Sequence, residues 1–145
     1  TLFVAGRLDK DTEGLLLLTN DGQFAHNMLS PKKHVPKTYY ALIDGKITAD
    51  DAAAFTAGIT LDDGLLCQPA QLEIITNGNP SEILLTITEG KFHQVKRMFA
   101  ARGHTVLYLK RQKIGKLTLD ETLSKGSIKK LTDDDLVLIG AERGV

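Results

Sequence analysis

The chain has 145 residues, which is the size of one ordinary domain and is long enough to bury a hydrophobic core. Hydrophobic residues make up 42% of it and charged residues 25%, and both fractions are typical of soluble globular chains. The formal net charge of +0 at pH 7 argues against a chain that binds nucleic acid over its whole surface, but it leaves local basic patches open.

The cysteine content and the hydropathy of the chain further narrow the class of protein. The single cysteine, Cys67, excludes an internal disulfide and a cysteine metal cluster. No apolar run approaches the length of a membrane span and no signal peptide is visible, so we expect a cytoplasmic protein without membrane contact. The chain starts at Thr1 and is already apolar at residues 2–4, as in a strand, so we expect a fragment of a longer protein.

Residues 5–22 combine a charged loop with an apolar run. The run from Leu15 to Leu18 has turn residues on both sides, a pattern that predicts a strand buried on both faces. The polar loop before it is flanked by Gly6 and Gly14 and carries Asp9. Sites are usually built on loops that a rigid element holds in place, so Asp9 is the first candidate functional residue.

Asp9 also has two structural interpretations. Residues 9–14 imitate the start of a calcium-binding loop, but the twelfth position is Asn20 instead of a bidentate glutamate, and we reject calcium binding. Asp9 could instead cap a turn or pair with Arg7 or Lys10. On spacing alone, this second role is favoured.

The next segment predicts a helix, a basic loop and a strand. Helical spacing of apolar residues predicts a short helix within residues 23–29, which ends before Pro31. The loop after it holds Lys32 and Lys33 and leads to Lys37, and it is either a solvated charge run or a loop that contacts phosphate. Residues 37–43 are rich in aromatic and β-branched side chains and predict a strand. Its two tyrosines, at positions 39 and 40, point to opposite faces, so only one of them can face a site.

Residues 48–88 predict a helix and a hairpin, and neither contains a candidate catalytic residue. Thr48 and Asp51 have the spacing of a capping box, and Gly58 ends the predicted helix. Two strands follow, at residues 68–76 and 82–88, and the turn between them makes a hairpin.

Residues 89–119 are the second functional stretch. Val95, Met98 and Phe99 share one face of a predicted helix that ends at Gly103, and Lys96 reads on spacing alone as an exposed helix lysine. Residues 91–119 contain eight Lys and Arg and no carboxylate, which predicts a segregated basic face of the kind that RNA binds. A strand is expected at 106–109 and a basic turn at 111–116. Together these elements predict one α+β domain with a mixed, largely antiparallel central sheet and two or three short helices.

The run from Gly6 to Gly22 resembles the signature of the RsuA/RluB/RluE/RluF family of pseudouridine synthases, and the stretches around Tyr39 and Lys96 match later motifs. The resemblance covers most of the chain. It implies the pseudouridine synthase catalytic-domain fold over residues 1–145, with a cleft across the central sheet where the Arg-Leu-Asp loop sits. Family members usually have another strand before this point, and several carry an S4-like RNA-binding domain upstream, so we expect both to be missing here.

The resemblance also assigns roles to residues. It implies that Asp9 is the catalytic carboxylate, that Tyr39 stacks on the target base and that Lys96 pairs with Asp9. The alternatives from the residues alone are a core aromatic for Tyr39 and a surface lysine for Lys96. Arg7 would contact the RNA backbone or fill the vacated stack. The residues that we expect to bind RNA are Arg7, Lys32, Lys33, Lys37, Lys91, Arg97, Arg102, Arg111 and Lys113.

The implied reaction isomerises a uridine of ribosomal RNA to pseudouridine, which requires no cofactor and no metal. Residues 91–99 agree best with the branch that acts on small-subunit (16S) ribosomal RNA, as naked RNA or as an assembly intermediate, and we expect a monomer. The alternatives are a large-subunit (23S) RNA synthase and a non-catalytic RNA-binding module. A glycosidase would need a second positioned acid, for which Asp11 and Glu13 are candidates only by proximity in sequence.

Overall fold

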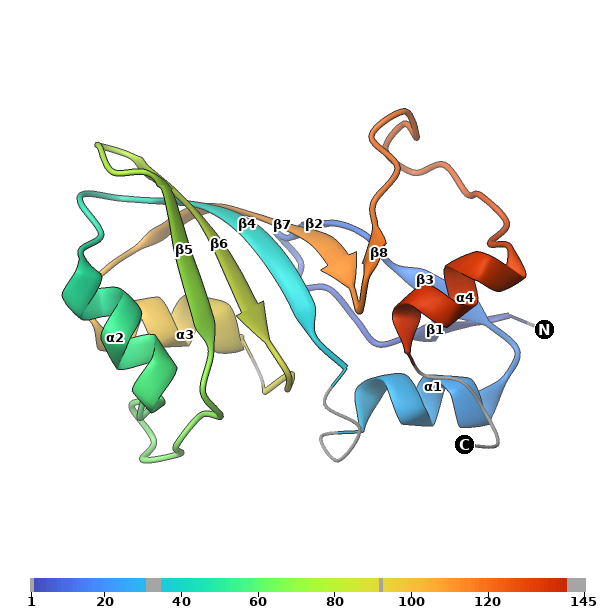
Figure 1. The fold of residues 1–145 in the computed structure, drawn as a ribbon, viewed down its shortest axis with the longest axis horizontal. Helices are drawn as coiled ribbons and strands as arrows, with labels where there is room; N and C mark the ends of the chain where they lie inside the picture. The colour runs from blue at the N-terminus through green and yellow to red at the C-terminus, as the bar shows by residue number, and fades with distance from the viewer. Residues whose placement is uncertain (1, 31–34, 92, 141–145) are drawn as a thin grey trace.

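The computed structural model describes residues 2–30, 35–91 and 93–140, in which the chain forms eight strands and four helices (Figure 1). The strands are β1 (Phe3–Ala5), β2 (Glu13–Gly14), β3 (Leu17–Thr19), β4 (Lys37–Ile43), β5 (Gln71–Thr76), β6 (Ser81–Ile87), β7 (Val106–Ile114) and β8 (Leu117–Thr118). The helices are α1 (Gly22–Leu29), α2 (Ala49–Ala57), α3 (Gln94–Ala101) and α4 (Asp133–Ile139). This mixture confirms the predicted α+β class, with one helix more than expected.

The described strands form a central sheet and a small separate one. The central sheet has the order β2-β7-β4-β6-β5, with β8 paired to β7, and only the β2–β7 pairing is parallel. β1 and β3 pair with each other in an antiparallel two-stranded sheet. The central sheet is therefore mixed and largely antiparallel, as predicted.

Local signals explain most of these elements. Strand β4 has the bounds that its aromatic and β-branched residues predict, and β5 and β6 form the predicted antiparallel hairpin. The side chain of Asp21 accepts hydrogen bonds from the first amides of α1, and Thr48 and Asp51 form the predicted capping box of α2. Thr132 and Asp135 cap α4 in the same way.

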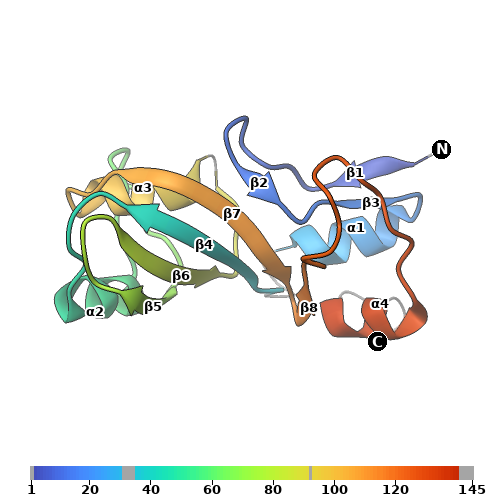
Figure 2. The ribbon, with the colours of Figure 1, turned by 90° about the horizontal axis from the view of Figure 1, so that it is seen from above.

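Two hydrophobic clusters support the two ends of the molecule. At one end, α2 and α3 pack near the central sheet, and Phe55 and Phe99 lie in the core with ring centroids 4.9 Å apart. At the other end, α1, α4 and the β1–β3 sheet enclose a second cluster that includes Met28 and Ile114. Figure 2 shows the two ends from above, with the curved strands β4 and β7 running between them.

Two local predictions are wrong. The run Leu15–Leu18 is not a strand buried on both faces: β3 covers only its second half, Leu17 is buried, and Leu16 and Leu18 are 40% and 42% exposed. The reason is that β3 pairs only with β1 in a two-stranded sheet, so alternate side chains face outward. The expected basic turn at 111–116 is also mostly strand, because β7 runs on to Ile114 before the chain turns at Gly115.

Candidate active site

A pocket of about 420 Å³ lies where the two hydrophobic clusters approach each other, within the ~300–1,000 Å³ range of small-molecule sites. Met28 lines it from one cluster, and Ile87, Val95 and Leu109 line it from the other. Its polar and charged lining residues are Arg7, Asp9, Thr12, Lys37, Tyr39, Glu89, Lys91, His93, Gln94 and Arg111. The pocket thus gathers residues from both ends of the molecule, including four of the predicted RNA contacts besides Asp9 and Tyr39.

The loop that carries Asp9 is held against strand β7 by its flanking glycine. Gly14 has a φ of +114°, and a Cβ at this position would lie 2.2 Å from the carbonyl oxygen of Arg111, so no other residue fits this close parallel pairing. Within the loop, the amide of Thr12 donates to the Asp9 carbonyl at 2.9 Å. The turn leaves the Asp9 side chain 30% exposed at the pocket.

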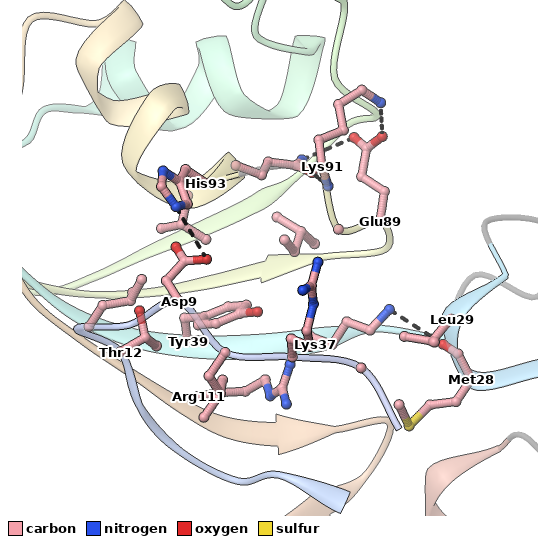
Figure 3. A pocket seen from close by; sticks show the side chains of 18 residues that line it. Asp9, Thr12, Met28, Leu29, Lys37, Tyr39, Glu89, Lys91, His93 and Arg111 are labelled. Carbon is pink, nitrogen blue, oxygen red and sulfur yellow. Dashed lines mark hydrogen bonds and ion pairs between the residues drawn. The ribbon is translucent and has the colours of Figure 1, made fainter. Parts of the chain in front are cut away.

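The structure places the imidazole of His93 beside the Asp9 carboxylate. Its Nε2 lies 4.0 Å from Asp9 Oδ1, as Figure 3 shows. His93 precedes α3 with a φ of 48°, the only positive φ of a non-glycine residue in the described part of the chain. Such strained backbone is frequent at functional sites. Sequence reasoning did not select His93, although it lies in the 91–99 motif.

Tyr39 and not Tyr40 faces the pocket. In Figure 3, Asp9 lies between His93 and the ring of Tyr39. Tyr40 is on the other face of β4, where its hydroxyl donates to Glu82 and its ring contacts Tyr108 edge-on, with 6.2 Å between centroids. The hydrogen bond to Glu82 raises the pKa of Tyr40 to about 12. The predicted alternation of the two tyrosines is confirmed.

The structure pairs Lys96 with Asp11 and does not bring it to Asp9. The Lys96 ammonium and the Asp11 carboxylate form an ion pair, and neither residue lines the pocket. The hydrogen bond from Lys96 lowers the pKa of Asp11. The Asp11 side chain is 71% exposed, so this pair lies at the surface of the molecule. The expected buried Lys96–Asp9 pair is therefore absent from the described structure.

The fold also brings carboxylates to the basic stretch, which has none in its own sequence. Five of its eight cations have ion pairs in the described residues: Lys91 with Glu89, Lys96 with Asp11, Arg97 with Asp62 and Asp63, Arg102 with Asp51, and Lys110 with Glu121. The segregated basic face is therefore largely neutralised, and the predicted RNA contacts of Lys91, Arg97 and Arg102 would compete with these pairs. The pairs of Lys96, Arg97 and Lys110 join exposed carboxylates and are weak, roughly 0–1 kcal/mol, so phosphate could replace them. The carboxylates of Glu89 and Asp51 are buried, and this argument does not extend to their pairs.

Two predicted RNA-binding residues lie in the pocket floor instead. Arg111 and Lys37 are only 4% and 5% exposed and line the pocket. Arg7 is exposed at the pocket edge, and Lys113 is exposed on β7 outside the pocket. Lys32 and Lys33 lie outside the described residues.

The pocket does not have the acid pair of a glycosidase. Glu13 is bound to Lys125 and, like Asp11, does not line the pocket. The second carboxylate there is Glu89. Burial would raise its pKa, but hydrogen bonds from Lys91, Gln68 and Gln94 hold the pKa below its ordinary value. A carboxylate held ionised in this way is poorly suited to be the proton donor of such a pair.

The described residues show neither a metal centre nor a membrane-spanning helix. No group of three or more His, Cys, Asp or Glu side chains is arranged to hold a metal ion. None of the described helices has the length and apolar character needed to cross a membrane.

Solved structures share this fold. A crystal structure of a pseudouridylate synthase superposes with a TM-score of 0.89 at 45% identity, over 95% of this chain and 59% of that one. The archaeal box H/ACA sRNP Nop10–Cbf5 complex contains a chain that shares the fold at a TM-score of 0.59 and 18% identity, over 86% of this chain and 42% of that one. The fold is thus that of the pseudouridine synthases.

Sequence comparison gives the family. The RNA pseudouridylate synthase family model matches residues 1–101, and the chain belongs to this family. It is 51% identical to the uncharacterised RNA pseudouridine synthase YtzG of Bacillus subtilis over 138 residues, which are 94% of this chain and 58% of that protein. It is also 51% identical to ribosomal small subunit pseudouridine synthase A of Vibrio cholerae over 139 residues, or 95% and 59%. The predicted family is confirmed, and the chain spans a little under three fifths of these relatives.

Proposed function

We propose that the protein containing this domain isomerises a uridine of small-subunit ribosomal RNA to pseudouridine, with Asp9 as the catalytic carboxylate. The observation that carries this proposal is the placement of Asp9 over Tyr39 in a pocket bounded by both hydrophobic clusters. The names of relatives that are 45–51% identical support the small-subunit target.

The reaction makes and breaks bonds within one nucleotide. The bond between N1 of uracil and C1′ of ribose breaks, the base turns, and C5 bonds to C1′. C5 loses its proton and N1 gains one, so atoms and electrons balance without an oxidant or reductant. The target base must first leave the RNA stack to reach a pocket of this kind.

Asp9 and Tyr39 each have their own role in the proposed reaction. Asp9 acts on the ribose, either as a nucleophile at C1′ or as the acceptor of a ribose proton. Tyr39 supports the flipped base by stacking. His93 lies on the other side of Asp9 from Tyr39, with its Nε2 4.0 Å from Asp9 Oδ1. Lys96 would join this group only after exchanging Asp11 for Asp9.

The test is release of tritium from uridine labelled at C5. The full-length protein is incubated with labelled small-subunit RNA, with its assembly intermediates, and with large-subunit RNA as the control. Release from small-subunit RNA or its intermediates is the expected result. Release from large-subunit RNA alone would reassign the target, and tight binding without release from any RNA would support a non-catalytic RNA-binding module.

A further inference from the structure

The floor of the pocket carries two buried cations that neighbour each other on the central sheet. Arg111 of β7 pairs with Tyr39 of β4, and Lys37 lies two residues before Tyr39 on the same face of β4. Burial, and to a smaller extent the charge of Arg111, lowers the pKa of Lys37. The two charges are therefore close enough to repel each other.

Protein groups accept only some of the hydrogen bonds that these two side chains can donate. Arg111 donates from Nε to the Leu15 carbonyl at 2.8 Å, but its buried Nη2 has no hydrogen-bond partner in the described residues. Lys37 donates from Nζ to the Met28 carbonyl at 3.4 Å, which is long for such a bond. Both side chains thus keep donor capacity at the pocket.

No carboxylate of the described residues neutralises this pair of cations. Of the two carboxylates that line the pocket, Asp9 faces His93 and Glu89 is bound to Lys91 and Gln94. No ion pair of the described residues involves Arg111 or Lys37. Buried charges without a counter-ion are costly, so an anion is the ligand that this floor favours.

We propose that Arg111 and Lys37 bind a backbone phosphate that flanks the target uridine and draw it into the pocket. This inference rests on the proposed function, in which the pocket receives one nucleotide of RNA. Uracil is neutral and brings no charge to these cations, whereas a phosphodiester brings one negative charge that both can contact. Guanidinium binds phosphate with a planar pair of N–H groups, and ammonium adds a point charge.

The position of this phosphate would align the nucleotide for reaction. Tyr39 is the cross-strand neighbour of Arg111, so a phosphate held at Arg111 and Lys37 leaves the attached base beside the Tyr39 ring and the ribose toward Asp9. Nη2 is shielded from solvent, so binding includes an outward shift of the loop at residues 7–12 or of the guanidinium. Both residues are positioning residues and do not touch the reacting atoms.

A double-mutant cycle between protein and RNA tests the contact. Once the target uridine is mapped, two RNA oligonucleotides are made with a neutral methylphosphonate at its 5′ or its 3′ phosphate. Their affinities for the full-length protein are measured in the D9N background, which keeps the substrate unconverted. One methylphosphonate should weaken binding about tenfold, as expected for loss of a charge-assisted hydrogen bond.

Protein variants then distinguish loss of the phosphate contact from a general effect of the substitution on the structure. In Lys37→Met or Arg111→Gln, the unmodified RNA should bind about tenfold more weakly, and the methylphosphonate should cost nothing more. Lys113→Gln is the matched control on the same strand and should keep the full methylphosphonate effect. Because Arg111→Gln also removes the donor to Leu15, Lys37→Met carries the test if the Arg111 variant does not fold.

Two results would overturn the inference. The first is a methylphosphonate effect of equal size in D9N alone and in D9N combined with Lys37→Met or with Arg111→Gln. The second is no effect of either methylphosphonate on binding to D9N alone, which would mean that these cations do not contact a phosphate next to the target uridine. Tritium release by the unmodified enzyme is measured separately. If the enzyme turns over but the effects of the protein substitution and of the methylphosphonate simply add, only the phosphate site is refuted. Absence of turnover refutes the proposed function.

Discussion

Arg111 lies directly opposite Tyr39 on the neighbouring strand, and both side chains line the pocket that contains Asp9. Directly opposite residues of antiparallel strands project to the same face, so this pairing fixes a cation beside the ring. The same face of β4 continues into the core through Ala41 and Ile43, which are fully buried. One strand therefore connects the rigid core to the floor of the site.

Tyr39→Phe should retain most of the activity, whereas Tyr39→Leu should lose it. The base is expected to stack on the ring, and stacking of a base on an aromatic side chain is worth about 1–3 kcal/mol, or roughly 5- to 150-fold. The measurement is kcat/KM for tritium release. The control is Tyr40→Phe, which removes only the hydroxyl bound to Glu82 on the other face and should leave kcat/KM unchanged. Equal loss in the Phe and Leu variants of Tyr39 would mean that its hydroxyl, and not its ring, is required.

Lys96→Met should lower turnover without lowering the melting temperature. The partner of Lys96 in the structure is the exposed Asp11, so loss of the ammonium leaves no buried charge behind. A large loss of stability is therefore not expected, while a role of Lys96 beside Asp9 during turnover remains a prediction. Thermal unfolding and tritium release are measured on the same preparations.

Asp11→Asn separates the two possible partners of Lys96. If Lys96 moves to Asp9 in the RNA complex, removal of the Asp11 charge should leave turnover intact or raise it. If Asp11→Asn lowers turnover as much as Lys96→Met, the Lys96–Asp11 pair itself is what the enzyme needs, and the pairing with Asp9 is wrong.

Asp51 should make the stability of the domain depend on pH in the acid range. Burial would raise its pKa, but hydrogen bonds from the Thr48 amide, Arg102 and His104 together hold the pKa below its ordinary value. Because the folded-state pKa is lower than the unfolded one, ionised Asp51 stabilises the fold fully above about pH 4. This stabilisation is lost as the pH falls through the folded-state pKa.

Thermal unfolding from about pH 2.5 to 7 tests this linkage. The D51N variant should melt lower than wild type at neutral pH, and the difference should shrink on acidification. Asp50→Asn is the matched control, since Asp50 is exposed in the same first turn of α2. A gap between wild type and D51N that stays constant with pH would contradict the linkage.

The sequence predicts elements that local chemistry determines. Strand β4 follows from its aromatic and β-branched residues, and the start of α2 follows from the Thr48–Asp51 capping box. The alternation of Tyr39 and Tyr40 follows from strand geometry. The choice of Asp9 and Tyr39 as site residues depended on the family resemblance, because their spacing alone favoured structural roles.

Features that depend on long-range contacts could not be predicted. Lys96 pairs with Asp11 from 85 positions away, and nothing near either residue indicates the other. The burial of Arg111 depends on the length of β7 and on its contacts with β4 and the Gly14 loop. Leu16 and Leu18 have the hydropathy of core residues, but the small β1–β3 sheet leaves them exposed.

The most direct test of the catalytic role of Asp9 is a comparison of Asp9→Asn with Asp11→Asn in the full-length protein. Tritium release and RNA affinity are measured in parallel on small-subunit RNA. Asparagine keeps the size of the side chain but removes the charge that acts on ribose, so Asp9→Asn should abolish release and leave affinity nearly unchanged, while Asp11→Asn keeps both. Substantial release by Asp9→Asn would contradict the assignment of Asp9 as the catalytic carboxylate.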